Sequence, residues 1–154
     1  MHVHFGVDLL EPEWRESVVC IGTFDGVHLG QDDLDPRAAR QLLGARAIIG
    51  YSTHNVAQAQ AAADLPITYV AIGPVFATAT KERPDLVVGL AGVARVRAVL
   101  PPAVPLVAIG GITEKNARAV LAAGADAVAV VSALLTSPAE IAARTAAFLQ
   151  SLSV

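Results

Sequence analysis

Residues 46–73 read RAIIGYSTHNVAQAQAAADLPITYVAIG, and this stretch decides the fold. A short apolar run from Arg46 to Tyr51 is followed by an alanine-rich stretch from Asn55 to Asp64 and by a second apolar run from Thr68 to Gly73. The apolar runs are continuous rather than alternating, which is typical of parallel strands that are covered on both faces. Asn55 is a favourable N-cap for a helix in the intervening stretch. The sequence here therefore predicts a strand–helix–strand unit of an α/β fold.

The same pattern continues along the chain on both sides of this unit. A long loop over 74–88 leads to a predicted helix over 89–100. Upstream, residues 18–43 supply one more unit, in which Val18–Phe24 is the predicted strand and Val27–Leu29 is either a separate strand or a loop. Downstream, the predicted strands are Pro105–Ile109 and Ala125–Ser132, and the predicted helices are Glu114–Ala123 and Pro138–Leu149.

The number of these units limits the architecture. A closed eight-stranded β/α barrel usually needs about 200 to 250 residues, and this chain has 154. The alternatives are a partial barrel, an open sheet, or a barrel that another chain completes. We expect a single domain over 1–154 that forms a partial TIM-type barrel of about five parallel strands with outer helices. Its two unpaired sheet edges would favour association, so a homo-oligomer such as a dimer is expected.

Composition and charge exclude several classes of function. The net charge is -3, so the chain offers no basic face for a row of phosphates, which argues against nucleic acid as a main partner. A single cysteine, Cys20, excludes an internal disulfide and fits a reducing compartment. No uninterrupted apolar stretch reaches the roughly 18 residues of a membrane helix, and residues 1–14 lack the features of a signal peptide. We therefore expect a cytoplasmic protein with no membrane partner.

Polar residues and glycines follow four of the predicted strands, where parallel α/β folds bind ligands. The glycines and the residues after the last strand would present bare N–H groups at helix N-termini, which favour an anion. Two threonine hydroxyls and a lysine ammonium would complete a cradle for pyrophosphate. Each feature alone also suits an ordinary turn, cap or solvated loop. In chain order these residues are Ser52 and His54; Thr78, Thr80 and Lys81; Gly110 and Gly111; and Val131 and Ser132.

Five motifs together resemble the later part of thiamine phosphate synthase. They are GVHLGQDDL, IIGYSTHN, YVAIGPVFATATK, VAIGGI and GADAVAVVSAL, and they cover about residues 26–148 in that family's order. The resemblance implies a TIM barrel that joins an aminopyrimidine pyrophosphate to a thiazole phosphate and releases pyrophosphate with Mg²⁺. It also implies that pyrophosphate departs first and that the thiazole nitrogen captures the pyrimidine cation, so stabilisation of the departing anion is the enzyme's main task.

The resemblance assigns roles to the residues that follow the strands. Ser52 and Lys81 are the implied catalytic residues that hold the pyrophosphate, and Asp33 is the implied Mg²⁺ ligand, a role that also suits a hard carboxylate. The other implied substrate-binding residues, most of them around the thiazole phosphate, are Thr78, Thr80, Gly110, Gly111, Val131, Ser132 and His54. His54 also matches a histidine implicated in proton transfer in the related thiazole tautomerases, although the TATK run favours the synthase.

The beginning of the chain departs from this pattern. The synthase barrel starts with a QLR-type pyrophosphate motif and an ND-type metal motif, and neither occurs upstream of Gly26. Residues 1–30 instead resemble the N-terminus of bifunctional riboflavin kinase/FAD synthetase, whose HxGH motif matches at His28 but has Gln31 in place of the second histidine. The two resemblances overlap at GVHLG, and we interpret this string as the junction between them.

Four hypotheses about function follow. The leading one is a thiamine-phosphate-synthase-type transferase, impaired by the missing strands. A non-catalytic phosphate-binding remnant and a thiazole tautomerase-like isomerase are the alternatives. Nucleotidyl transfer from ATP, dependent on His28, is the fourth, and it rests on about 30 matching residues only. Under each of these hypotheses, the expected ligands are small molecules that carry phosphate groups.

Overall fold

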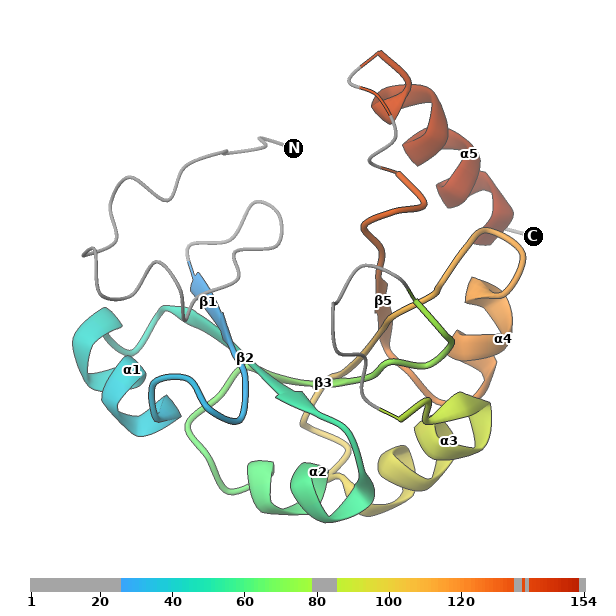
Figure 1. Ribbon diagram of the computed structural model, residues 1–154. Coiled ribbons are helices and arrows are strands. Elements are labelled where there is room, and N and C mark those ends of the chain that lie inside the picture. The colour runs from blue at the N-terminus through green and yellow to red at the C-terminus, as the bar shows by residue number, and fades with distance from the viewer. Residues whose placement is uncertain (1–25, 79–85, 135–136, 138, 153–154) are drawn as a thin grey trace.

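The computed structural model describes residues 26–78, 86–134, 137 and 139–152. Within these ranges, five parallel strands form one sheet in the order β1-β2-β3-β4-β5, and a helix follows each strand (Figure 1). The expected α/β fold with about five parallel strands is therefore confirmed. The strands are β1 (Gly26–Leu29), β2 (Ile48–Thr53), β3 (Tyr69–Ile72), β4 (Leu106–Ile109) and β5 (Ala127–Ala129), and the helices are α1 (Pro36–Leu43), α2 (Val56–Ala62), α3 (Gly89–Val99), α4 (Ala117–Ala122) and α5 (Ile141–Leu152).

The strand order explains why the sheet resembles part of a barrel. Each crossover leads to the next strand on the same side, and because such crossovers are right-handed, every helix falls on one face of the sheet. Figure 1 shows the result: the strands form an arc, and the helices lie along its outer side. The inner, concave face carries no helix from the described part of the chain. In the described residues, β1 and β5 each have a strand partner on one side only.

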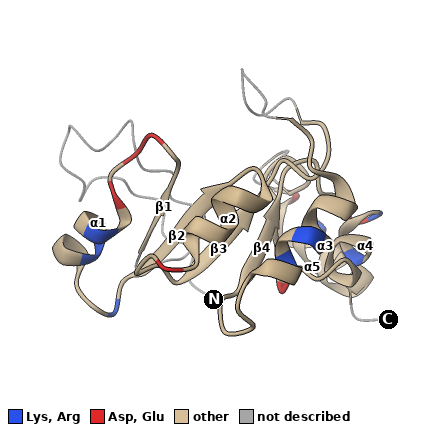
Figure 2. Ribbon diagram, turned by 90° about the horizontal axis from the view of Figure 1, so that it is seen from below, with Lys and Arg blue, Asp and Glu red and all other residues tan. Residues whose placement is uncertain are grey.

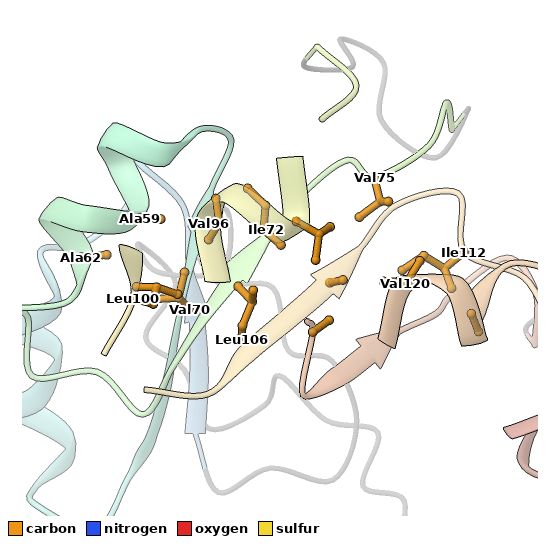
Figure 3. Close-up of a cluster of buried hydrophobic side chains, with 14 of the residues drawn as sticks. Ala59, Ala62, Val70, Ile72, Val75, Val96, Leu100, Leu106, Ile112 and Val120 are labelled. Atoms are coloured by element: carbon orange, nitrogen blue, oxygen red, sulfur yellow. The ribbon is translucent and has the colours of Figure 1, made fainter. Parts of the chain in front are cut away.

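The hydrophobic core lies between the sheet and the helices on its outer face. Ile72 on β3 and Leu106 on β4 are fully buried there, and Val96 of α3 and Val120 of α4 pack in the same cluster (Figure 3). A second, smaller cluster joins Leu29 and Ile49 to Ala39 of α1. None of the five strands carries a lysine, arginine, aspartate or glutamate, so the charged residues lie on helices and connections (Figure 2).

Local signals account for several helix ends. The Asn55 side chain accepts a hydrogen bond from the backbone N–H of Gln58 at 2.9 Å and caps α2, as predicted. Asp35 caps α1 in the same way, and proline at the first position of that helix needs no N–H donor. No helix among the described residues is long and apolar enough to cross a membrane.

Some predicted boundaries were wrong. The helix after the glycine pair begins at Ala117 rather than Glu114, because residues 113–116 form a turn in which the Asn116 side chain accepts from the N–H of Thr113. The last strand covers only three residues, as an edge strand with one partner in the described sheet. The undecided segment Val27–Leu29 belongs to β1. The predicted strand Val18–Phe24 lies outside the described residues.

Candidate functional site

The concave face carries a row of polar side chains across the first three strands. The strand register aligns His28 of β1 with Gly50 of β2, and Gly50 with Tyr69 of β3. Ser52 lies two residues beyond Gly50, so its side chain shares this face, because alternate residues of a strand point to the same side. Three chain segments far apart in sequence thus contribute to one cluster on the concave face.

The histidine at the centre of this cluster contacts both hydroxyl groups. His28 Nδ1 lies 3.0 Å from the Tyr69 hydroxyl oxygen, and His28 Nε2 lies 3.1 Å from Ser52 Oγ. The His28 and Tyr69 rings also stack, with centroids 5.7 Å apart. Burial lowers the pKa of His28 below its usual 6.5, against an opposing effect of Asp33, and burial raises the pKa of Tyr69 above 10.0. At neutral pH the imidazole is therefore uncharged and the phenol keeps its proton.

Gly50 makes this contact possible. A Cβ atom at position 50 would overlap the Tyr69 ring and the Nδ1 atom of His28. Only glycine lets the two rings meet above the strand that lies between them. Glycine is therefore needed at this position of IIGYST for side-chain packing, which the pattern of apolar residues does not reveal.

The loop after β1 holds the backbone next to Ser52. The Gln31 side-chain amide donates to the Ser52 carbonyl oxygen at 2.5 Å, although Gln31 itself is exposed. Asp33, half-buried, accepts a hydrogen bond from the backbone N–H of Gly30 at 2.6 Å through its Oδ2 atom. The motif GQDD thereby brings one amide to the end of β2 and holds one carboxylate at the end of β1.

The described residues form no cluster of three or more histidine, cysteine, aspartate or glutamate side chains that could hold a metal ion. Asp33 is the one predicted metal ligand among them, and its Oδ1 atom is not used in the bond to Gly30. This donor set fits the way proteins often bind Mg²⁺, in which one or two carboxylates act together with phosphate oxygens of the substrate.

His54 lies apart from the Ser52 cluster, although Ser52 is in β2 and His54 directly follows that strand. The His54 ring bonds to the Gly73 carbonyl oxygen through Nδ1 at 2.6 Å, and its backbone N–H donates to the Gln58 side chain at 2.7 Å. It also lines a cavity of about 500 Å³ whose other walls come from α2, α3 and the segment before α3. The structure therefore does not place His54 in hydrogen-bond contact with Ser52.

Two of the predicted loops are joined to each other. The backbone N–H of Phe76 donates to the Gly110 carbonyl oxygen at 3.0 Å, and the N–H of Val75 donates to that of Ile109 at 2.9 Å. Gly110 and Gly111 have φ values of 96° and 65°, and a Cβ atom at either would overlap Pro74 or Phe76. The glycine pair thus allows both a left-handed turn and a close approach of the two loops.

The expectation of bare N–H groups at helix N-termini was wrong for these positions. Helix α4 begins six residues after Gly111, and α5 begins nine residues after Ser132. Val131 and Ser132 instead start a turn, closed by the N–H of Leu134 donating to the Val131 carbonyl oxygen at 3.1 Å. Ser132 is exposed and Val131 is half-buried.

Thr78 is half-buried at the end of the described part of its loop. Thr80 and Lys81 lie outside the described residues. All four predicted loops nevertheless begin at the same end of the sheet, because the strands are parallel and each loop follows the C-terminal end of a strand.

The sequence matches a known protein family. The family model for thiamine monophosphate synthase matches residues 20–134. The chain belongs to this family. Thiamine-phosphate synthase from Koribacter versatilis is 48% identical over 138 residues, which are 90% of this chain and 63% of that protein. The same enzyme from Agrobacterium fabrum is 46% identical over 137 residues, 87% of this chain and 62% of that protein.

A solved structure of a thiamine phosphate pyrophosphorylase from Pyrococcus furiosus has the same fold. Its TM-score is 0.71 at 32% identity, over 83% of this chain and 59% of that one. The chain therefore spans about 60% of the length of these thiamine monophosphate synthase relatives. The family match begins at residue 20 and includes part of the segment that resembles FAD synthetase. That second resemblance stays a prediction.

The sequence did not assign His28, Tyr69 or Gln31 to this site. The pattern places His28 and Gln31 in the motif GVHLGQDDL without a role for either at this site, and it places Tyr69 in an apolar strand. A signal was present, since a histidine and a tyrosine stand in strands that are otherwise apolar. The two residues are 41 positions apart in the sequence, and their contact depends on the strand register, which the sequence does not reveal.

Proposed function

We propose that this chain carries out the transfer typical of its family, joining an aminopyrimidine pyrophosphate to a thiazole phosphate with release of pyrophosphate. The observation that carries the proposal is Ser52 on the concave face at the C-terminal end of β2, in a member of the thiamine monophosphate synthase family. Its hydroxyl bonds to His28, and its backbone carbonyl accepts from the Gln31 side chain. Two relatives that are 46% and 48% identical are thiamine-phosphate synthases.

The reaction breaks the bond between a pyrimidine carbon and a pyrophosphate oxygen, and the electron pair leaves with the pyrophosphate. The thiazole nitrogen then forms the new bond to that carbon. The protein's main contribution is to place hydrogen-bond donors and positive charge where negative charge develops. Ser52 and Lys81 would bind the departing pyrophosphate. The turn at Gly110 and Gly111, with Thr78, Thr80, Val131 and Ser132, would bind the thiazole phosphate.

Mg²⁺ would be held by Asp33 together with oxygens of the pyrophosphate, and it would neutralise charge on the leaving group. The hydrogen bond from Gly30 fixes the orientation of the Asp33 carboxylate at the end of β1. A carboxylate that is held in place loses less conformational entropy when it binds a ligand. Small phosphate-bearing molecules are the partners that this site would bind.

The test is an assay of thiamine phosphate formation with both substrates and Mg²⁺, alongside calorimetric titration with magnesium pyrophosphate. Lys81→Ala is the informative variant, and Lys115→Ala is its matched control because these are the only two lysines. The proposal predicts turnover and pyrophosphate binding that Lys81→Ala reduces by at least about tenfold, as expected for loss of a charge-assisted contact. Lys115→Ala should leave both unchanged.

Two of the alternative hypotheses would give different results in these experiments. Saturable pyrophosphate binding without thiamine phosphate formation would identify a phosphate-binding remnant. Isomerisation of a thiazole phosphate substrate that depends on His54 would identify a tautomerase. Absence of both binding and turnover in the folded protein would overturn the proposal.

A further inference from the structure

The strongest unassigned feature is a hydrogen-bonded line of three side chains across the concave face. It runs from the Tyr69 hydroxyl on β3 through the His28 ring on β1 to the Ser52 hydroxyl on β2. Both ring nitrogens of His28 are occupied by these two hydroxyls. In the described part of the chain, the Ser52 hydroxyl has no hydrogen-bond partner other than His28.

The chemistry of the two hydroxyls determines which way the hydrogen bonds run. A neutral imidazole carries one hydrogen, so one nitrogen donates and the other accepts. A phenol, with an ordinary pKa of about 10, is a much stronger donor than an aliphatic hydroxyl. Tyr69 therefore donates to Nδ1, and the imidazole hydrogen occupies Nε2, because the bond at one nitrogen sets the tautomer at the other.

This tautomer fixes the role of Ser52. The His28 Nε2–H group donates to Ser52 Oγ, so the serine oxygen accepts from the imidazole and its own hydrogen is directed elsewhere. In the opposite tautomer, the serine hydrogen would be consumed by Nε2 and Ser52 would have no hydrogen to offer a ligand. The direction of the line thus decides whether Ser52 can bind an anion through a donated hydrogen bond.

We propose that Tyr69 and His28 are positioning residues that hold the Ser52 hydroxyl as a hydrogen-bond donor to the departing pyrophosphate. The proposal rests on the function proposed above. Burial of the line supports it, since the lowered pKa of His28 and the raised pKa of Tyr69 keep both groups in their neutral forms at pH 7. The Gln31 side chain contributes by holding the Ser52 backbone carbonyl.

The first test measures the tautomer directly and needs no ligand. Nitrogen-15 chemical shifts of the His28 ring in the full chain should show hydrogen on Nε2 and none on Nδ1. Tyr69→Phe, which deletes one oxygen, should convert this into a mixture of both tautomers. Tyr51→Phe is the matched control because Tyr51 is the only other tyrosine and lies on the same sheet. It should leave the His28 signals unchanged.

The second test is a double-mutant cycle on binding of magnesium pyrophosphate. Tyr69→Phe should weaken binding by about three- to tenfold in the wild-type background, as expected for one misdirected hydrogen bond. It should have no further effect in a Ser52→Ala background, since no serine hydroxyl is left to orient. In the transfer assay, Tyr69→Phe should lower kcat more than it changes KM, because the charge on pyrophosphate is greatest as it departs.

The outcomes separate this proposal from the function on which it rests. Hydrogen on Nδ1 of His28 in the wild-type chain would overturn the proposal, whatever the protein binds. Equal effects of Tyr69→Phe in the Ser52 and Ser52→Ala backgrounds would also overturn it, because they would show a general packing role. Failure of the wild-type chain to bind pyrophosphate, with the Nε2–H tautomer observed, would instead refute the proposed function and leave the predicted hydrogen-bond direction confirmed.

Discussion

The two faces of the same sheet differ sharply in what they bury. On the outer face, Ile72 and Leu106 are fully buried beneath helices, and even Thr53 is buried, with its hydroxyl donating to the Ala71 carbonyl at 2.8 Å. On the concave face, His28 and Ser52 are only half-buried and bond to each other. Alternate residues of single strands thus serve different purposes. The outer face stabilises the fold, and the concave face carries the polar groups that a ligand can contact.

The largest expected effect is on stability, from truncating an outer-face side chain. Ile72→Ala should lower the free energy of unfolding by about 2 to 5 kcal/mol, because it leaves a cavity in the main core. Ile109→Ala is the matched control. By the alternation of side chains along β4, Ile109 lies on the concave face, and it is only half-buried. Urea denaturation of both variants measures the difference.

A clearly smaller loss of unfolding free energy for Ile109→Ala would support the conclusion that the outer face contributes most to stability. Equal losses for the two variants would contradict it, since they would mean that the concave face is packed as tightly as the core.

A smaller effect is expected where the concave face is closely packed at one point. Gly50→Ala should destabilise the chain by about 1 to 3 kcal/mol, because the added methyl group would push apart the His28 and Tyr69 rings. The same variant should shift the ring signals of both residues in an NMR spectrum. Adding Tyr69→Ala should reduce the cost of Gly50→Ala, because the tyrosine ring supplies most of the overlap. A Gly50→Ala chain with native stability and unchanged ring signals would contradict the geometry of the cluster.

The smallest effect is a dependence of stability on pH. The pKa of His28 is lower in the folded chain than its ordinary value of 6.5, so the unfolded chain binds a proton first as the pH falls. The contribution of His28 to stability is therefore complete above about pH 6.5 and decreases as the pH falls through the folded pKa. Asp33 opposes this shift and limits its size.

The measurement is the slope of unfolding free energy against pH between 5 and 7, for wild type and His28→Gln. The wild-type slope should be more positive, even if His28→Gln is less stable at every pH. Identical slopes would show that the His28 pKa is unchanged by folding.

The sequence predicted the fold well because the outer face leaves a strong pattern. Continuous apolar runs in 46–51 and 105–109 and an Asn cap at position 55 gave strands and a helix within a few residues of those observed. Errors occurred where side-chain bonds compete with the helix, as at Asn116, whose side chain forms a turn before α4. Strand β5 was overestimated because its apolar residues continue beyond the paired segment.

The site was harder to predict because its contacts are long-range. The sequence placed Ser52 at the C-terminal end of a parallel strand, where it lies in β2, and such strand ends are common ligand positions. Its partners were not predicted, because the His28–Ser52 and His28–Tyr69 pairs are 24 and 41 residues apart and depend on which strands are neighbours. The glycine pair was predicted at a helix N-terminus, whereas its positive φ angles serve the approach of the loop at Phe76.

We propose that the chain binds its ligand on the concave face, at the C-terminal ends of the strands. The most direct measurement is a map of backbone amide shifts by NMR as magnesium pyrophosphate is added to the full chain. We expect saturable shifts at His28, Ser52 and the glycine turn at 110–111, with little change at Ala59 and Val96 in the helical layer. Shifts confined to the helical layer, or none at saturating pyrophosphate, would contradict this proposal.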